Sequence, residues 1–160
     1  MQFPLVINWL VRRLGDVGAL AAFAACLYYR KEISANFTSG TWNLSNFYGA
    51  IFDWAAIQTG FVFGVYTYIV SKSAGFSEAI KGTEPYAEMI LFIKTIFYLV
   101  FALAVISIPL LVMTPKPEPT LSTTTILFAA WTALVVFTFF SFLRIIRAFS
   151  TIERVKRVGK

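Results

Sequence analysis

The sequence predicts an all-α integral membrane protein, a four-transmembrane-helix bundle with short loops. Of its 160 residues, 58% are hydrophobic and only 14% are charged, whereas a soluble domain has about 45–50% apolar and about 25% charged residues. Four apolar stretches approach or exceed the length of about 20 residues that crosses the hydrocarbon of a bilayer. The segments between them are too short to enclose a core, so we expect residues 1–160 to form one transmembrane domain.

We expect the spans at approximately 14–29, 47–70, 87–113 and 123–146. The first is the shortest, because Arg13 and Arg30 bound it and the 17 positions between them cover about 26 Å. Snorkelling of these side chains can make up the difference. In an alternative version, residues 3–29 form one long element that turns inward at Gly15. A signal peptide is a further alternative for this region, but we expect an uncleaved helix.

Local signals mark where the later spans begin. Glu84 and Pro85 are typical of a helix start, and Ser122 or Thr123 can cap the fourth span.

Four aromatic side chains are expected at the membrane–water interface on the outer side of the membrane. These are Tyr28, Tyr29, Trp42 and Tyr48.

The distribution of Lys and Arg predicts the orientation. With four spans, both chain ends and the 71–86 loop share one side, which holds ten basic residues against three on the other side. Cytoplasmic loops carry the excess of basic residues. We therefore expect both termini in the cytoplasm and the chain in a membrane, most simply the bacterial inner membrane.

The second predicted span carries a stripe of small residues with one carboxyl among them, within a sector of about 100°. Its members are Gly49, Asp53, Ala56, Gly60 and Gly64. Small residues allow helix backbones to approach closely in lipid. The first span offers a similar row, consisting of Gly18, Ala22 and Cys26. Two interpretations stay open: packing of these spans within one chain, and contact between spans of different subunits.

Four polar residues fall inside the spans and are candidates for a pore or for packing: Asp53, Gln58, Thr59 and Lys94. A charge in the bilayer costs at least roughly 2.5–3.5 kcal/mol on insertion scales. Counting from the span ends places Asp53 and Lys94 roughly 10 Å apart in depth, so a direct ion pair is not expected.

Each polar residue has a structural and a functional interpretation. Lys94 can snorkel to the cytoplasmic interface, and Asp53 can bond Tyr48, Trp54 or hydroxyls of a neighbouring helix. In the functional interpretation all four line a polar path in the bundle or between subunits. Gln58 points about 140° away from Asp53 on the same helix, so one face cannot carry both into one pore.

The C-terminal tail, residues 147–160, is predicted to be a basic cytoplasmic extension of the last helix. The basic residues of this region are Arg144, Arg147, Arg154, Lys156, Arg157 and Lys160. They are expected to bind anionic lipid or, alternatively, an acidic cytoplasmic partner. No nucleic-acid partner is expected, because no folded basic surface accompanies the tail.

Catalytic chemistry has little support in the composition. The chain has no histidine and one cysteine, which excludes Ser-His-Asp triads and ordinary zinc or haem ligation. Nucleotide-binding glycine loops are absent from the sequence. We therefore expect no cofactor, no metal and no enzymatic activity. Asn36 and Asn43 match the glycosylation pattern, which matters only in a secretory pathway.

These observations predict a non-catalytic polytopic membrane protein that acts as a homo-oligomer or as a structural or accessory subunit of a membrane complex. The first alternative is a small oligomeric pore or membrane-perturbing effector gated through its cytoplasmic loops. The second is a cation- or proton-coupled transporter that uses Asp53, although broken helices and inverted repeats, the usual signs of a transporter, are not visible.

Overall fold

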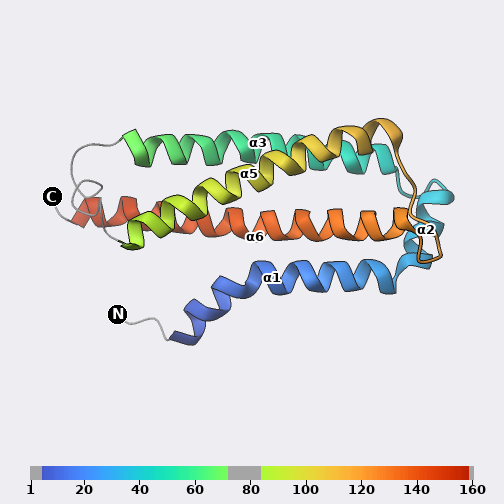
Figure 1. Ribbon diagram of the computed structural model, residues 1–160, viewed down its shortest axis with the longest axis horizontal. Coiled ribbons are helices and arrows are strands. Elements are labelled where there is room, and N and C mark those ends of the chain that lie inside the picture. The colour runs from blue at the N-terminus through green and yellow to red at the C-terminus, as the bar shows by residue number, and fades with distance from the viewer. Residues whose placement is uncertain (1–4, 72–83, 159–160) are drawn as a thin grey trace.

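The computed structural model describes residues 5–71 and 84–158, with side chains for 13–71, 84 and 86–147. In this part of the chain the protein is all-α, with five helices and no strand. The helices are α1 (Leu5–Tyr28), α2 (Arg30–Thr38), α3 (Leu44–Ser71), α5 (Glu84–Met113) and α6 (Thr123–Val158). The four long helices run alternately in opposite directions, and α2 lies across one end of them (Figure 1).

Two of the described helices are long and apolar enough to cross a membrane. The qualifying segments are Tyr86–Met113 of α5 and Thr123–Arg147 of α6. Of α1, side chains are described only for residues 13–28, and in α3 the polar side chains of Asp53 and Gln58 lower the hydropathy. The sequence prediction of four long helices is confirmed, while membrane crossing by any of them stays a prediction.

The helix boundaries differ from the predicted spans at the N-terminal side. α1 begins at Leu5 and runs through Gly15 to Tyr28 without interruption, which agrees with the longer alternative for the first element and not with a start at residue 14. Figure 1 shows that α1 is bent in its N-terminal part. At the other end of the chain α6 continues to Val158, so the predicted helical extension of the last span is confirmed.

A short helix, α2, forms in the segment between the first two predicted spans, for which the sequence analysis gave no helix. Its sequence is polar on average, but Ile33 and Phe37 are one turn apart and Phe37 is buried. Side chains spaced by four share one helix face, so α2 is held by packing of that face. The sequence analysis did not predict this helix, because Ile33 and Phe37 are its two large apolar residues and give only a weak pattern.

The long helices are arranged as two pairs. α1 packs mainly against α6, and α3 packs mainly against α5; in Figure 1, α6 lies between α1 and the α3–α5 pair. A Cβ placed on Gly18 of α1 would lie 2.8 Å from Cε2 of Phe140 and 3.3 Å from Cγ1 of Val136, both on α6. Gly18 of α1 therefore permits close contact with α6, and packing of its row against the stripe on α3 within the chain is not observed.

An aromatic cluster ties α2, α3 and α6 together near the end of the bundle where α2 lies. Its members are Phe37, Phe47, Tyr48, Phe128 and Trp131, with ring centroids 5.0 to 6.5 Å apart in the contacting pairs. Edge-to-face and tilted ring pairs at such distances are favourable. Trp131 Nε1 donates a hydrogen bond of 3.2 Å to Oγ of Ser107, which adds α5 to the cluster.

Tyr48 is a part of this cluster and not of an exposed aromatic belt. Its side chain is 1% exposed and its hydroxyl donates to the carbonyl oxygen of Pro115 at 3.2 Å. The belt prediction was therefore wrong for Tyr48. Tyr28, Tyr29 and Trp42 are exposed at this end, as predicted.

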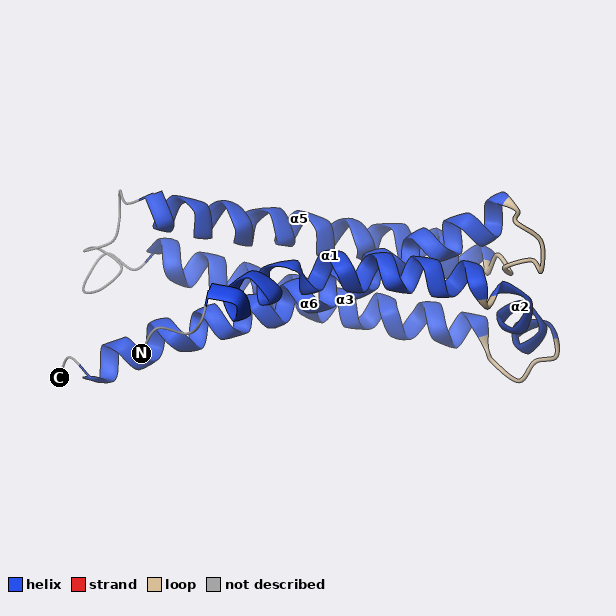
Figure 2. Cartoon of the chain, turned by 90° about the horizontal axis from the view of Figure 1, so that it is seen from below, coloured by secondary structure: helices blue, strands red, loops and turns tan. Residues whose placement is uncertain are grey.

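The ends of the helices divide into two groups. The start of α1, the end of α3, the start of α5 and the end of α6 lie at one end of the bundle (Figures 1 and 2). α2 and the connection 114–122 lie at the other end. Ser122 accepts a hydrogen bond of 3.4 Å from the backbone N–H of Thr125 and so caps α6, as its sequence predicted.

Candidate functional site

The face of α3 that carries most of the small-residue stripe points away from the rest of the chain. Asp53, Ala56, Gly60 and Gly64 are exposed, whereas the buried face of α3 consists of Leu44, Tyr48, Ala55, Gln58, Val62, Val65 and Ile69. A Cβ added to Gly60 or Gly64 would have no described atom within 4 Å. Packing of these glycines within one chain is therefore not observed, and contact with another chain stays a prediction.

Gly49 differs from the other members of the stripe. It is half-buried, and a Cβ built on it would lie 3.7 Å from Cδ1 of Leu111. This part of α3 contacts α5, whereas Gly60 and Gly64 lie on a face that α5 does not cover. Gly49 therefore serves packing within the chain, as one of the two sequence interpretations expected.

Asp53 bonds neither of the two aromatic residues that we expected beside it. The hydroxyl of Tyr48 donates to Pro115, and the ring of Trp54 packs against that of Phe139 at a centroid distance of 6.0 Å. Thr59 donates its hydroxyl to the carbonyl of Ala55, at 2.8 Å within the same helix. The side chain of Asp53 is therefore exposed on the outward face of α3.

Lys94 lies on α5 and is also exposed. Two contacts give the register of α5 on α3: Phe63 with Phe97 at 5.9 Å between ring centroids, and Gly49 with Leu111. In this register Lys94 is level with Tyr66, thirteen residues from Asp53, or about 20 Å along the helix axis. The sequence estimate of roughly 10 Å was too small, and the two charges are far from forming an ion pair.

Gln58 is the polar residue that the bundle encloses. Its side chain is 1% exposed, and neither atom of its amide has a hydrogen-bond partner within the described part of the chain. Asp53 is exposed and Gln58 is buried, which agrees with their predicted 140° offset. A buried amide without partners destabilises a fold by about 1–3 kcal/mol.

Two hydroxyl side chains of α6 lie at the level of Gln58. Ring contacts of Trp54 with Phe139 and of Phe61 with Phe142 fix this level. Thr138 and Ser141, on the same stretch of α6, are buried. The hydroxyl of Thr138 lies 2.9 Å from the carbonyl oxygens of Leu134 and Val135 in its own helix. The middle of the bundle therefore contains a polar layer, which no spacing of the sequence pattern indicated.

Of the basic residues predicted to bind lipid or a partner, Arg144 has a contact inside the protein. Its guanidinium carbon lies 4.2 Å from the ring centroid of Phe92 on α5, a cation–π geometry. Arg147 is exposed. The side chains of Arg154, Lys156 and Arg157, and the whole of Lys160, lie outside the described residues, so the prediction for the tail is untested there.

Asn36 and Asn43 have structural roles. The side-chain amide of Asn36 donates to the carbonyl of Glu32 at 2.9 Å, and Oδ1 of Asn43 accepts from the backbone N–H of Asn46 at 3.0 Å, which caps α3. No group of three His, Cys, Asp or Glu side chains within the described residues could hold a metal ion. That the protein uses no cofactor stays a prediction.

Comparison with protein-family models, with curated proteins and with solved structures found no match. Function must therefore be inferred from this chain's own residues.

Replacing Gln58 by Leu should stabilise the folded chain by about 1–2 kcal/mol, because a buried amide without partners is exchanged for an apolar side chain of similar volume. The measurement is the thermal unfolding midpoint in one detergent. Ser107→Ala is the matched control in the same core: it removes the acceptor of Trp131 Nε1 and should destabilise by about 1–3 kcal/mol. A lower midpoint for Gln58→Leu would mean that the amide has a partner in the assembled protein.

Proposed function

We propose that the protein is an integral membrane protein in which α1, α3, α5 and α6 all cross the bilayer. The long apolar segments of α5 and α6 support this. Only 22% of the most apolar stretch of α5, and 28% of that of α6, is buried in the chain. A core helix of a soluble protein would be mostly buried. Large apolar side chains are exposed on the other long helices too, including Leu20 of α1 at 70% and Ile57 of α3 at 73%. Lipid is the surrounding that removes such a surface from water.

We further propose that the bundle end with both chain termini faces the cytoplasm, in the manner of a bacterial inner-membrane protein. The ten-to-three distribution of Lys and Arg supports this orientation. In this arrangement α2 and the connection 114–122 are outside. The basic end of α6 lies at the cytoplasmic surface, where it binds anionic lipid or an acidic partner.

Labelling of single cysteines tests this topology. In a Cys26→Ala background, a membrane-impermeant maleimide should label Ser39→Cys, after α2, in intact cells. It should label Val158→Cys, at the end of α6, only after the membrane is opened. Labelling of position 158 from outside would contradict the proposed orientation. Labelling of both positions in intact cells, with an unlabelled cytosolic control, would contradict the three membrane crossings proposed between them, those of α3, α5 and α6.

The proposed function is that of a non-catalytic subunit, which assembles with copies of itself or serves as a structural or accessory part of a membrane complex. One observation carries this proposal: the outward face of α3 presents Asp53, Gly60 and Gly64 where no part of the described chain covers them. A carboxyl at membrane depth is costly in lipid, and two glycines four apart allow a second helix to approach closely. A neighbouring subunit would satisfy both.

Gly64→Leu tests the proposal. The added side chain has open space within the chain, so the subunit should fold normally, but it should separate α3 from a neighbouring subunit. Overpacking of a close interface costs about 1–3 kcal/mol, so the assembly should weaken roughly tenfold or more. The particle mass in detergent and in nanodiscs gives the measurement.

Ala130→Leu is the matched control, since Ala130 is also small and exposed but lies on α6. It should leave the mass of the assembly unchanged. A wild-type protein that is strictly monomeric and retains no partner would contradict the proposal, and so would an unchanged assembly in Gly64→Leu.

A pore between subunits is the alternative function, and the exposed carboxyl of Asp53 favours it over a pore within one chain. In a closed cyclic assembly a residue on a shared face meets its copies around an axis. Neighbouring carboxyls then favour a bound counter-ion or a neutral form. Gln58 could not take part in such a path, because it is enclosed on the opposite face of α3.

Asp53→Asn distinguishes the pore from the subunit role. In liposomes, a pore should lose cation flux by roughly tenfold, since acidic rings favour cation entry, and the mass of the assembly should not change. In the subunit role neither the wild type nor the variant conducts ions, and the substitution alters only stability or retention of a partner. Flux that is equal in both proteins would exclude Asp53 from the path.

A further inference from the structure

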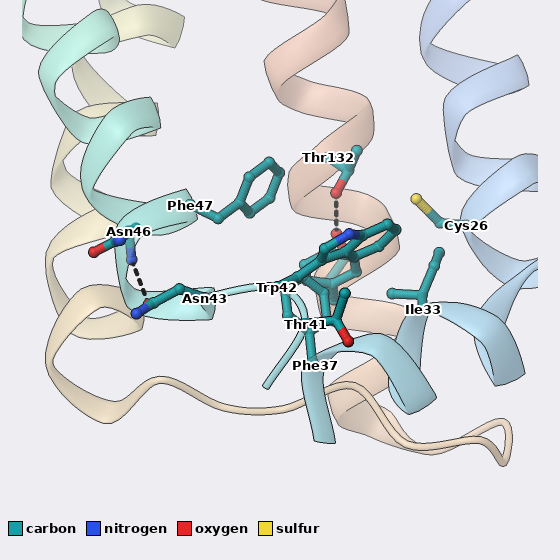
Figure 3. A pocket seen from close by; sticks show the side chains of 10 residues that line it. Cys26, Ile33, Phe37, Thr41, Trp42, Asn43, Asn46, Phe47 and Thr132 are labelled. Atoms are coloured by element: carbon teal, nitrogen blue, oxygen red, sulfur yellow. Dashed lines mark hydrogen bonds between the residues drawn. The ribbon is translucent and has the colours of Figure 1, made fainter. Parts of the chain in front are cut away.

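A cavity of about 630 Å³ lies between α1, α3 and α6 at the end of the bundle where α2 is found (Figure 3). Cys26 of α1 and Thr132 of α6 are among the residues that line it, together with Phe37 and Ile33 of α2 and Phe47 of α3. It exists because α1 and α3 pack on different partners and leave a gap over α6. Its volume falls within the range of about 300–1,000 Å³ that is typical of small-molecule sites.

The lining of the cavity is almost entirely apolar. Its walls are aromatic and aliphatic, and Thr41, Asn43 and Asn46 border it without giving it much polar surface. All three of these polar residues are exposed. In Figure 3, Thr41, Asn43 and Asn46 lie nearer to the outer loops than Thr132 does. The cavity is therefore apolar, and the polar residues at its rim lie toward the end of the bundle where α2 lies.

Two basic residues lie at the start of α2, one turn before Ile33 of the cavity wall. Arg30 is on the same face of α2 as Ile33 and Phe37, by the helical spacing of three and seven positions, and Lys31 follows it. One terminal nitrogen of Arg30 donates to the carbonyl of Leu27 at 2.8 Å, while its Nε is buried with no partner within the described residues. An anionic group close to the start of α2 would be attracted by two positive charges, and Glu32 is the acidic residue beside them in this turn.

We propose that this cavity binds the acyl chain of an anionic amphiphile, with the chain among Cys26, Phe47 and Thr132 and the carboxylate or phosphate head near Arg30 and Lys31. This site is separate from the outward face of α3 and does not depend on assembly of the chain. A free fatty acid and an anionic phospholipid share the required chemistry, which is one apolar chain and one negative head.

The test is photolabelling of the full-length protein in a non-ionic detergent. The probe is a long-chain fatty acid with a diazirine near its methyl end, and mass spectrometry locates the labelled residues. We expect labels on peptides that contain Cys26, Phe47 or Thr132. Excess unlabelled fatty acid should compete. The same chain carried in an anionic phospholipid is the second arm, and the stronger labelling of the two identifies the source.

Substitutions in the cavity and at Arg30, each with a control, make the test specific to this site. Thr132→Trp fills the cavity and should reduce labelling of these peptides by roughly tenfold or more, whereas Ala130→Trp, two residues away on an exposed position of the same helix, should not. Arg30→Gln should weaken labelling by the fatty acid several-fold and leave labelling by the corresponding alcohol unchanged. Unfolding midpoints confirm that each variant is folded, and Cys26→Trp replaces Thr132→Trp if that variant is not.

Some results would overturn the proposal. Labelling that spreads evenly over exposed residues such as Leu20 and Leu91, or that persists in a folded cavity-filled variant, would show only general contact with the acyl chains. Cross-links between two copies at the same peptides, without lipid labelling, would show that a second chain occupies the cavity. Equal labelling by the acid and the alcohol in the wild type would remove the role of Arg30 and Lys31.

Discussion

The chain has more apolar surface than its helices can cover by packing on one another, and this excess governs the rest of the structure. α5 and α6 meet their neighbours along one side and expose large side chains such as Val112 at 78% and Leu127 at 60% on the other. Burial of apolar surface drives folding in water, so a chain that leaves this much exposed needs lipid or further protein around it. Short connections and a low charge content agree with that requirement.

Polar groups in such an apolar chain need partners, and the structure treats them in three ways. Hydroxyls such as those of Thr59 and Thr138 donate to carbonyls of their own helices, which satisfies them locally. Asp53 and Lys94 are kept on the outside, at different levels. Gln58 is enclosed without a partner in the described chain. An exposed carboxyl would be costly in lipid, whereas the amide of Gln58 is enclosed by its own chain and is costly in any surrounding.

Side chains of both helix pairs contact one another at the end of the bundle where α2 lies. Aromatic rings from α2, α3 and α6 meet there, and Trp131 connects them to Ser107 of α5. The same arrangement leaves the cavity beside Cys26 and Thr132, because α2 closes the end of a gap that α1 and α3 do not fill. One feature, the pairing of α1 with α6 and of α3 with α5, therefore determines both the stable cluster and the open site.

The sequence by itself determined the all-α class, the number of long helices and the extension of α6, because long apolar runs and capping residues such as Ser122 act locally along the chain. It also fixed that Asp53 and Gln58 lie on different faces of one helix, which follows from helical periodicity. Which face of α3 is buried depends on the helix that packs against it, and the sequence pattern does not identify that helix. Only the tertiary structure decided that Gly18 packs on Phe140 and that Gly60 and Gly64 face outward. It also decided that Phe37 of α2 is buried.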